Sequence, residues 1–152
     1  MTTFEIESID PLPAAVVRAE VPMDELTGVF DRAIPEVMHV VAEQGLALTG
    51  PPFGYYPRSP GATVEVTVGF PVSGPVVARG EVEPMELPGG RAVVGIHVGP
   101  FDSLASTYQE LLAWVAAEGL ELAVGMWEVY LTDPSAEPDP SRWRTRIVWP
   151  LA

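Results

Sequence analysis

The feature that most constrains the fold of this chain is an internal repeat. Residues 15–21 read Ala-Val-Val-Arg-Ala-Glu-Val and residues 92–98 read Ala-Val-Val-Gly-Ile-His-Val, and a helical pattern follows each run. Each half continues through Gly-Leu to a short aromatic strand, at 53–56 or 127–130, and ends in a strand that closes with an aromatic residue and proline. Two β-α-β-β units cannot each bury a sheet face alone, so we expect them to pair about a pseudo-twofold axis.

Hydrophobic spacing predicts one helix in each half. The second helix is expected over about 103–118, where apolar residues recur at helical intervals and Gly119 stands where a C′ glycine ends a helix. The first helix is expected over about 24–43. Pro35 lies inside this span and has no backbone N–H, so the helix is predicted to be kinked or broken near Asp31.

Length and composition fit a single domain over 1–152, and the two β-α-β-β repeats, at about 4–80 and 81–152, predict an α+β fold. A chain of 152 residues can bury most of its unfolded surface without a disulfide or a metal, and this one has no cysteine. The stretch 80–90 holds two prolines and a Gly-Gly pair and is expected to connect the halves. There is no signal peptide and no segment of membrane-spanning length, so we expect a cytoplasmic protein that does not associate with membranes.

The charge balance argues against direct binding to nucleic acid. The formal net charge is −13, and the only tight basic cluster is Arg142, Arg144 and Arg146, which is more typical of a solvated or ion-paired strand face than of a phosphate track. Lysine is absent, which excludes Schiff-base chemistry on a side-chain amine. His39 and His97 lie far apart on different elements, so neither a metal site nor a cofactor is predicted.

Glu128 is the residue that points most strongly to a function. It lies in the run 126–131, which is otherwise built from aromatic and aliphatic residues that favour a strand. Side chains alternate along a strand, so Glu128 shares one face with Tyr130, and Trp127 lies on the other face. A carboxylate among aromatic rings attracts a lipophilic cation through its charge and through cation–π contacts of the rings. The alternative is a glutamate on the solvated face of an edge strand.

Three segments carry a family resemblance. They are Ile-His-Val-Gly-Pro-Phe-Asp-Ser-Leu at 96–104 with its continuation to 151, Pro-Pro-Phe-Gly-Tyr-Tyr at 51–56, and Leu-Pro-Gly-Gly-Arg-Ala-Val at 87–93. Their order and spacing resemble the GyrI-like small-molecule-binding domain, which is also the effector-binding half of some AraC-type and MerR-type multidrug regulators. The resemblance covers essentially the whole chain. It implies a tandem SHS2-like pair of β-α-β-β units with a ligand cleft between them.

The same resemblance implies a role for Glu128 and for its surroundings. A glutamate at this position meets the cationic or polar groups of bound drugs. Tyr56 is expected to face the cleft because its repeat partner, Tyr130, shares a face with Glu128. Gly54 occupies the position equivalent to Glu128, which leaves room for a ligand and makes the pocket asymmetric. Filling of the core, with the hydroxyls at the surface, is the alternative for both tyrosines.

Four further residues complete the candidate ligand-binding set. Trp127 is expected in the core against the helices, although family members place aromatic residues from several elements around the ligand. Phe101 and Tyr108 are candidates for the pocket wall. His97 precedes Gly-Pro-Phe near the mouth of the expected cleft, where a pocket role and a strand-end role remain equally open.

Two classes of function follow. The first is a binding protein that senses or sequesters lipophilic, often cationic small molecules. The second is a hydrolase, because some stand-alone members of the family open cyclopropane-containing compounds by adding water. In that role Glu128 would orient or deprotonate the water and Tyr56 would donate a proton or a hydrogen bond. The helix-turn-helix segment of the related regulators has no counterpart here, so transcriptional control by this chain alone is not expected. The family name also suggests a regulator or gyrase as partner, but no concentrated acidic run supports it.

Overall fold

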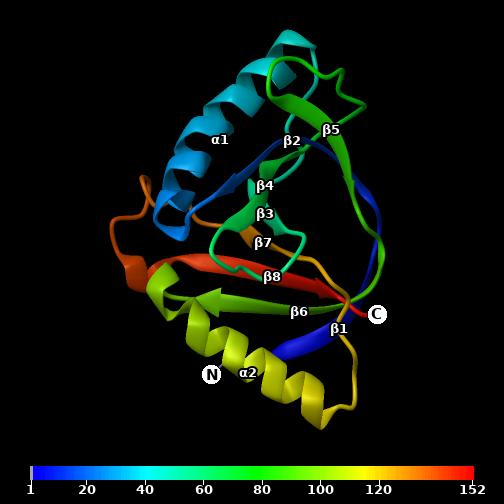
Figure 1. The fold of residues 1–152 in the computed structure, drawn as a ribbon, viewed down its shortest axis with the longest axis vertical. Coiled ribbons are helices and arrows are strands. Elements are labelled where there is room, and N and C mark those ends of the chain that lie inside the picture. Colours follow the sequence, from blue (N-terminus) through cyan, green and yellow to red (C-terminus); the bar gives the residue numbers. More distant parts are fainter. Residues whose placement is uncertain (1) are drawn as a thin grey trace.

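All the strands of the protein form one antiparallel sheet, and two helices lie against it (Figure 1). A computed structural model describes residues 2–152. The strands are β1 (Phe4–Ile9), β2 (Leu12–Val21), β3 (Phe53–Tyr56), β4 (Val64–Pro71), β5 (Val82–Leu87), β6 (Gly90–Val98), β7 (Met126–Tyr130) and β8 (Arg144–Pro150). The helices are α1 (Leu26–Glu43) and α2 (Leu104–Ala117), with the short 3-10 helices η1 (Met23–Glu25), η2 (Phe101–Ser103) and η3 (Pro140–Arg142).

The order of the strands interlocks the two halves of the chain. The sheet runs β1-β6-β8-β7-β3-β4-β2-β5, so β3 and β7 are its central pair. In this pair Gly54 lies directly opposite Glu128. At the edges, β1 precedes β2 in the chain but pairs with β6, and β5 precedes β6 but pairs with β2. Each half therefore supplies the edge strand of the other half.

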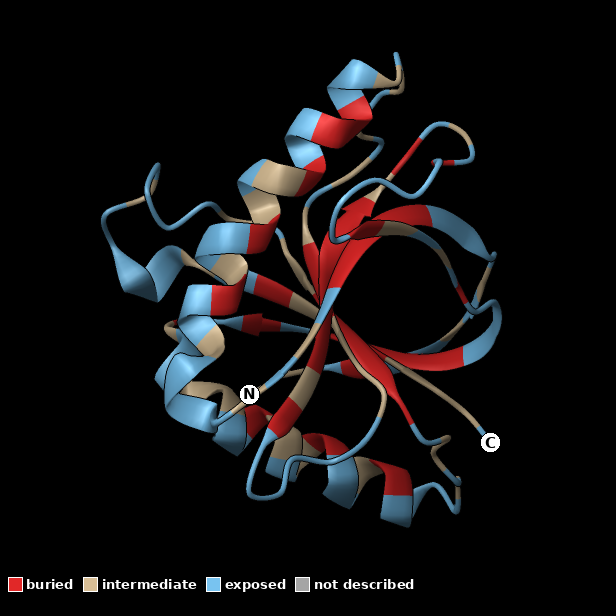
Figure 2. Ribbon diagram, turned by 45° about the horizontal axis from the view of Figure 1, so that its top comes forward, coloured by how far each residue is buried: buried red, intermediate tan, exposed pale blue. Residues whose placement is uncertain are grey.

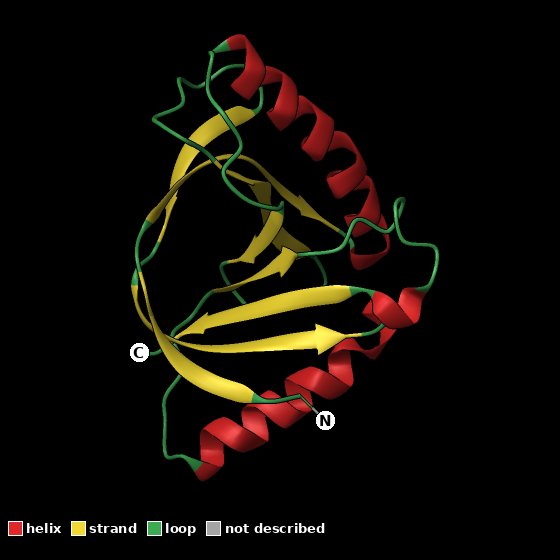
Figure 3. Cartoon of the chain, turned by 180° about the vertical axis from the view of Figure 1, so that it is seen from behind, coloured by secondary structure: helices red, strands yellow, loops and turns green. Residues whose placement is uncertain are grey.

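Buried residues concentrate along the strands and on the inner sides of the helices (Figure 2). The helices lie toward opposite ends of the sheet, with α1 against β2, β4 and β5 and α2 against β6 (Figure 3). Buried clusters under α1 and under α2 occupy the helix-covered face. A third cluster, on the other face, is formed by residues of the strands alone: Ala14, Val16, Phe53, Leu87, Ala92, Val94, Trp127 and Val148.

The predicted helices are present, and glycine ends both of them. Gly45 and Gly119 have φ angles of 70° and 67°, in the left-handed region that glycine adopts without steric cost, so the predicted C′ role of both is confirmed. The prediction was a kink or a break near Asp31, and the break is wrong, because α1 is continuous through Pro35. A buried stripe along α1, which includes Val29 and Val37, packs on the sheet and offsets the backbone hydrogen bond that proline cannot make.

Two strands were not expected from the sequence. The segment 82–87 was predicted as a connection, but it forms β5, and residues 4–9 form β1. Pro84 is compatible with a strand because β5 is at the edge of the sheet, where one row of backbone donors has no strand to pair with. Each half therefore contains two strands before its helix, and the predicted β-α-β-β unit lacks the first of them.

The alignment of residues 15–21 with 92–98 is wrong by one residue. It matches Val16 with Val93, but Val16 belongs to the cluster formed by strands alone and Val93 belongs to the cluster under α2. A shift of one residue along a strand reverses the face of every side chain. The shared letters Ala-Val-Val therefore do not mark positions with the same environment.

Two of the three arginines in the basic cluster at 142–146 are paired with acids. Arg146 Nη2 lies 3.3 Å from Glu7 Oε1 on β1, and Arg142 Nε lies 3.7 Å from Asp139 Oδ2. This arrangement agrees with an ion-paired face. Within residues 2–152, no helix combines the length and the apolar character needed to cross a membrane.

Candidate functional site

Glu128 lies at the centre of the sheet, on the helix-covered face. It is only 7% exposed. Tyr108 of α2 donates a hydrogen bond to Oε2, and Tyr130, two residues along β7, donates one to Oε1 at 2.9 Å. Each carboxylate oxygen therefore has a hydroxyl partner. No arginine, lysine or histidine of the described chain forms an ion pair with it.

Burial controls the protonation of this group of residues. It raises the pKa of Glu128 above 4.5, whereas the hydrogen bonds of Tyr108 and Tyr130 and then the charge of His97 act in the opposite direction. Burial, and after it the charge of Glu128, also raises the pKa values of Tyr56, Tyr108 and Tyr130. The tyrosine hydroxyls therefore stay protonated as donors, and the Glu128 carboxylate is more basic than an exposed one.

A row of four aromatic rings connects this group to the surface. The ring of Phe30, on α1, meets Tyr130 edge to face with centroids 5.4 Å apart. On the other side of Tyr130 lies Phe101, at 5.9 Å, and Phe101 in turn lies 5.1 Å from Trp143. Phe101 is 40% exposed, so the row runs from solvent to the residues beside Glu128. Such rings present the negative faces that attract cations.

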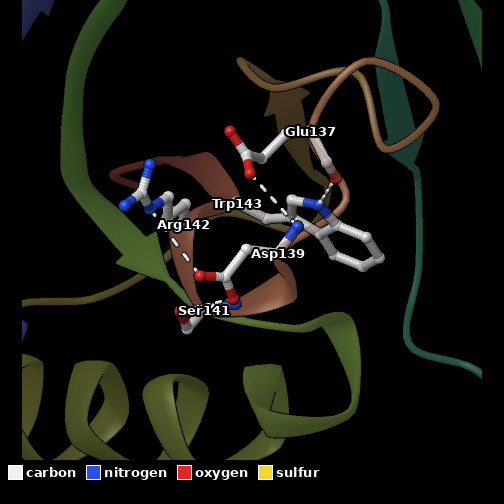
Figure 4. A network of polar contacts seen from close by, with 5 residues as sticks. All are labelled: Glu137, Asp139, Ser141, Arg142 and Trp143. Carbon is white, nitrogen blue, oxygen red and sulfur yellow. Dashed lines mark hydrogen bonds and ion pairs between the residues drawn. The ribbon is translucent and has the colours of Figure 1, made fainter.

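Polar contacts within the loop before β8 fix the position of Trp143 (Figure 4). The indole Nε1 donates to the carbonyl oxygen of Glu137 at 2.9 Å. The Asp139 carboxylate accepts hydrogen bonds from the backbone N–H and the hydroxyl of Ser141 and pairs with Arg142. These local bonds order a segment rich in proline and acidic residues and present the indole to Phe101.

The room expected beside Gly54 is filled by aromatic side chains. A Cβ added at Gly54 would lie 2.9 Å from the Phe30 ring and 2.9 Å from the Tyr130 hydroxyl oxygen. Surface hollows of about 470 and 330 Å³ lie elsewhere, the larger beside β1, β6 and β8, and neither is lined by Glu128. Side chains therefore enclose the Glu128 carboxylate, and Phe30 and Tyr130 occupy the space beside Gly54.

This packing makes a prediction about stability. Gly54→Ala is expected to lower the free energy of unfolding by about 1 kcal/mol, because the new methyl group overpacks two ring ends that can yield only partly. Urea denaturation measures the change. Gly28→Ala is the matched control: Gly28 lies in α1 with no atom near its added Cβ, so alanine there should stabilise by roughly 0.5–1 kcal/mol. Equal stabilisation by both variants would contradict the tight packing at Gly54.

The structure brings together most of the residues that the sequence proposed. Tyr56 packs against both helix-side clusters, so it lies between the two ends of the sheet. With Gly54, Tyr108 and Tyr130 it surrounds Glu128, and Phe101 lies at the outer end. Trp127 is separate, because it is buried in the cluster on the opposite face and packs with strands and not with the helices.

His97 is engaged in local bonds at the start of α2. It is 3% exposed, with Nδ1 2.6 Å from the Thr107 hydroxyl and Nε2 3.0 Å from the carbonyl oxygen of Pro100. The Ser103 hydroxyl lies 3.1 Å from the same Nε2. These contacts fit a structural role for His97 at the end of β6. In the described part of the chain, no cluster of three histidines or carboxylates could hold a metal ion.

Two aromatic residues of the site were missed. Phe30 lies within the predicted first helix, but helical spacing does not indicate its contact with Tyr130, since that depends on how α1 crosses the sheet. Trp143 lies in the Pro-, Ser- and Asp-rich segment before β8. An isolated tryptophan in such a polar loop is the signal that could have identified it.

Several known structures share this fold. The C-terminal domain of EcmrR is 24% identical, with a TM-score of 0.86, and the match covers 100% of this chain and 98% of that one. In the complex of EcmrR with DNA, at 23% identity and a TM-score of 0.82, the match covers 99% of this chain but only 57% of the EcmrR chain.

Two more distant structures are similar over nearly their whole length. A hydrolase encoded by lin2189 of Listeria innocua is 16% identical with a TM-score of 0.69, and the match covers 98% of this chain and 91% of that one. SAV2435 bound to tetraphenylphosphonium is 10% identical with a TM-score of 0.67, with 99% and 94% covered. No curated protein sequence matches significantly.

The sequence itself matches one family description over almost its full length. The model of the GyrI-like small molecule binding domain aligns with residues 2–152. The fold agrees with that match, because the single antiparallel sheet with two helices is shared with the C-terminal domain of EcmrR. The chain therefore belongs to the family of GyrI-like small molecule binding domains.

Proposed function

We propose that this protein is a receptor for lipophilic cations and that Glu128 is the anchor for their charge. The observation that carries the proposal is a buried carboxylate that has two hydroxyl donors but no ion-pair partner in residues 2–152, beside a row of aromatic rings. Removing a carboxylate from water costs several kcal/mol unless a cation accompanies it. A cationic ligand would supply the missing charge, and the rings would contact its apolar surface.

The arrangement of the sheet supports a binding cleft between the two halves of the chain. Its strand order reads the same from either end when β1 to β4 are exchanged with β5 to β8. We propose that the halves, about 4–80 and 81–152, are related by a pseudo-twofold axis that passes between β3 and β7. Gly54 and Glu128 face each other across this axis. Glycine on one side and an acid on the other give a symmetric scaffold an asymmetric site with one charge.

Tetraphenylphosphonium, the molecule bound to SAV2435, is a suitable probe of the proposal. We expect this protein to bind it, because the cation combines a delocalised charge with four aromatic rings. Tetraphenylborate is the control, since it has the same shape and the opposite charge. Isothermal titration calorimetry with both ions should give binding of the cation alone. Equal binding of the two ions would show that apolar contact and not Glu128 governs recognition.

A hydrolase is the second candidate, and one observation favours it. The Glu128 carboxyl has a raised pKa and touches two protonated tyrosine hydroxyls, which is an arrangement suited to general acid–base chemistry. The similar fold of the Listeria innocua hydrolase is compatible with it. In this role Glu128 would take a proton from water. Tyr108 and Tyr130 contact the carboxylate directly and would be proton donors along with Tyr56.

A further inference from the structure

Thr145 has a buried hydroxyl that forms no hydrogen bond within residues 2–152. The residue is 0% exposed, so bulk solvent does not reach it. An unpaired buried donor costs about 1–3 kcal/mol, and few proteins retain one without a reason. Valine has nearly the same shape and would avoid this cost. The hydroxyl therefore calls for a functional explanation.

The register of the sheet places this hydroxyl beside the Glu128 site. Thr145 is the direct partner of Tyr130 on β7 and of His97 on β6. Residues paired across antiparallel strands point to the same face, so Thr145 shares the helix-covered face with Glu128. Glu128 itself pairs with Ile147, two residues further along β8. Thr145 and Glu128 are therefore diagonal neighbours, a relation that places their Cα atoms roughly 7–8 Å apart.

The neighbouring polar side chains are already engaged elsewhere. The ring nitrogens of His97 meet Thr107 and Pro100, and the hydroxyl of Tyr130 donates to Glu128. Tyr130 also contacts the rings of Phe30 and Phe101, and its hydroxyl occupies Oε1 of Glu128, so a molecule that binds this oxygen in its place would displace Tyr130. The same displacement would expose the Thr145 hydroxyl to that molecule.

We propose that Thr145 is a second polar subsite of the binding site, which takes an oxygen substituent of a lipophilic cation anchored at Glu128. The inference rests on the proposed receptor function. It narrows the ligand class to cations that carry a hydroxyl, carbonyl or ether oxygen about one benzene ring away from the charge. Glu128 then selects for charge, and Thr145 selects among cations of similar size.

Three matched cations test the proposal. Tetraphenylphosphonium has no hydrogen-bonding group, and the 3- and 4-hydroxyphenyl triphenylphosphonium isomers each add one hydroxyl. The unmodified protein is expected to bind at least one isomer about 5- to 10-fold more tightly than the parent cation, the gain expected from one net hydrogen bond. Thr145→Val should abolish this preference and leave the affinity for the parent cation unchanged. Thr145→Ser, which keeps the hydroxyl, should retain the preference.

A second measurement separates the unpaired hydroxyl from one that is already bonded. Without ligand, Thr145→Val should raise the Tm by about 2–4 °C, because an apolar group of the same shape replaces an unpaired donor. Thr107→Val is the matched control, since the buried Thr107 hydroxyl contacts His97. That variant should lower the Tm and keep the preference for the hydroxylated cation. A lower Tm in Thr145→Val would mean that the hydroxyl is satisfied by water, which overturns the proposal.

The binding results distinguish the subsite from the receptor function. If the unmodified protein binds all three cations equally, or if Thr145→Val keeps the preference, Thr145 is not a subsite although the receptor function stands. If none of the three cations binds, both the receptor function and the subsite are rejected.

Discussion

Glu128→Gln is expected to weaken the binding of tetraphenylphosphonium about 10- to 100-fold and to leave the fold intact. Glutamine keeps the shape, and its amide can still form hydrogen bonds with Tyr108 and Tyr130. What it removes is the charge, and a charged interaction in a buried site contributes about 1–3 kcal/mol. Isothermal titration calorimetry measures the affinity, and circular dichroism checks the fold. Glu121→Gln is the control, because Glu121 is exposed and the change in net charge is identical.

The pH dependence of binding follows from the same residue. Burial raises the pKa of Glu128 above 4.5. A cation prefers the ionised carboxylate, so affinity should be full above the raised pKa and should fall as the pH decreases through it. An exposed carboxylate would lose its charge only at lower pH. Glu128→Gln has no such group and should show an affinity independent of pH in this range. Unchanged affinity in that variant at neutral pH would remove Glu128 from the site.

Binding at Glu128 also requires breaking interactions that the protein makes without a ligand. The group around Glu128 keeps aromatic contacts among Phe30, Tyr130 and Phe101 and two hydrogen bonds on Glu128. Each aromatic pair contributes about 0.5–1.5 kcal/mol, so a ligand that displaces Tyr130 must replace these interactions. Bulky aromatic cations can do so, because their rings take the place of the displaced ones. Small cations such as ammonium cannot, and this makes size as important as charge.

The sequence predicted the elements whose signals are local. The spacing of apolar residues located α2, and the glycines at 45 and 119 located the ends of both helices. β1 and β5 were missed because their partners are distant in the chain: Phe4 pairs with Gly95, and Val82 pairs with Val17. Such pairings depend on how the two halves interlock. The sequence pattern within a six-residue strand such as β1 or β5 does not encode which distant strand it pairs with.

The candidate site was predictable to the extent that it follows strand alternation. The period of two placed Glu128 and Tyr130 on one face and Trp127 on the other, as the structure has them. The contacts of Phe30 and the bond from Tyr108 to Glu128 depend on where the helices cross the sheet, which helical periodicity does not define. The closed packing at Gly54 follows from these crossings as well.

The test with the largest effect distinguishes the receptor from the hydrolase. In a hydrolase, Glu128 moves a proton in the rate-limiting step, and such groups contribute typically 10²–10⁴-fold. Glu128→Gln should then lower kcat for water addition to a cyclopropane-containing electrophile by about 10²–10⁴ with little change in KM. Tyr108→Phe, Tyr130→Phe and Tyr56→Phe show which tyrosine donates the proton, since only the donor's loss should lower kcat comparably. Product analysis by mass spectrometry detects the added water.

In a receptor the same variants behave differently. The carboxylate is needed only for attraction, so Tyr56→Phe should change the affinity for a cation less than about threefold, because the hydrogen bonds on Glu128 come from Tyr108 and Tyr130 and not from Tyr56. We expect this result, and no water addition by the unmodified protein above the uncatalysed rate. Burial explains the preference: Glu128 is 7% exposed and both of its oxygens accept a tyrosine hydrogen bond, so water reaches the remaining acceptor positions only when a neighbouring side chain moves. Water addition by the unmodified protein that Glu128→Gln abolishes would reverse this conclusion and identify Glu128 as a catalytic residue.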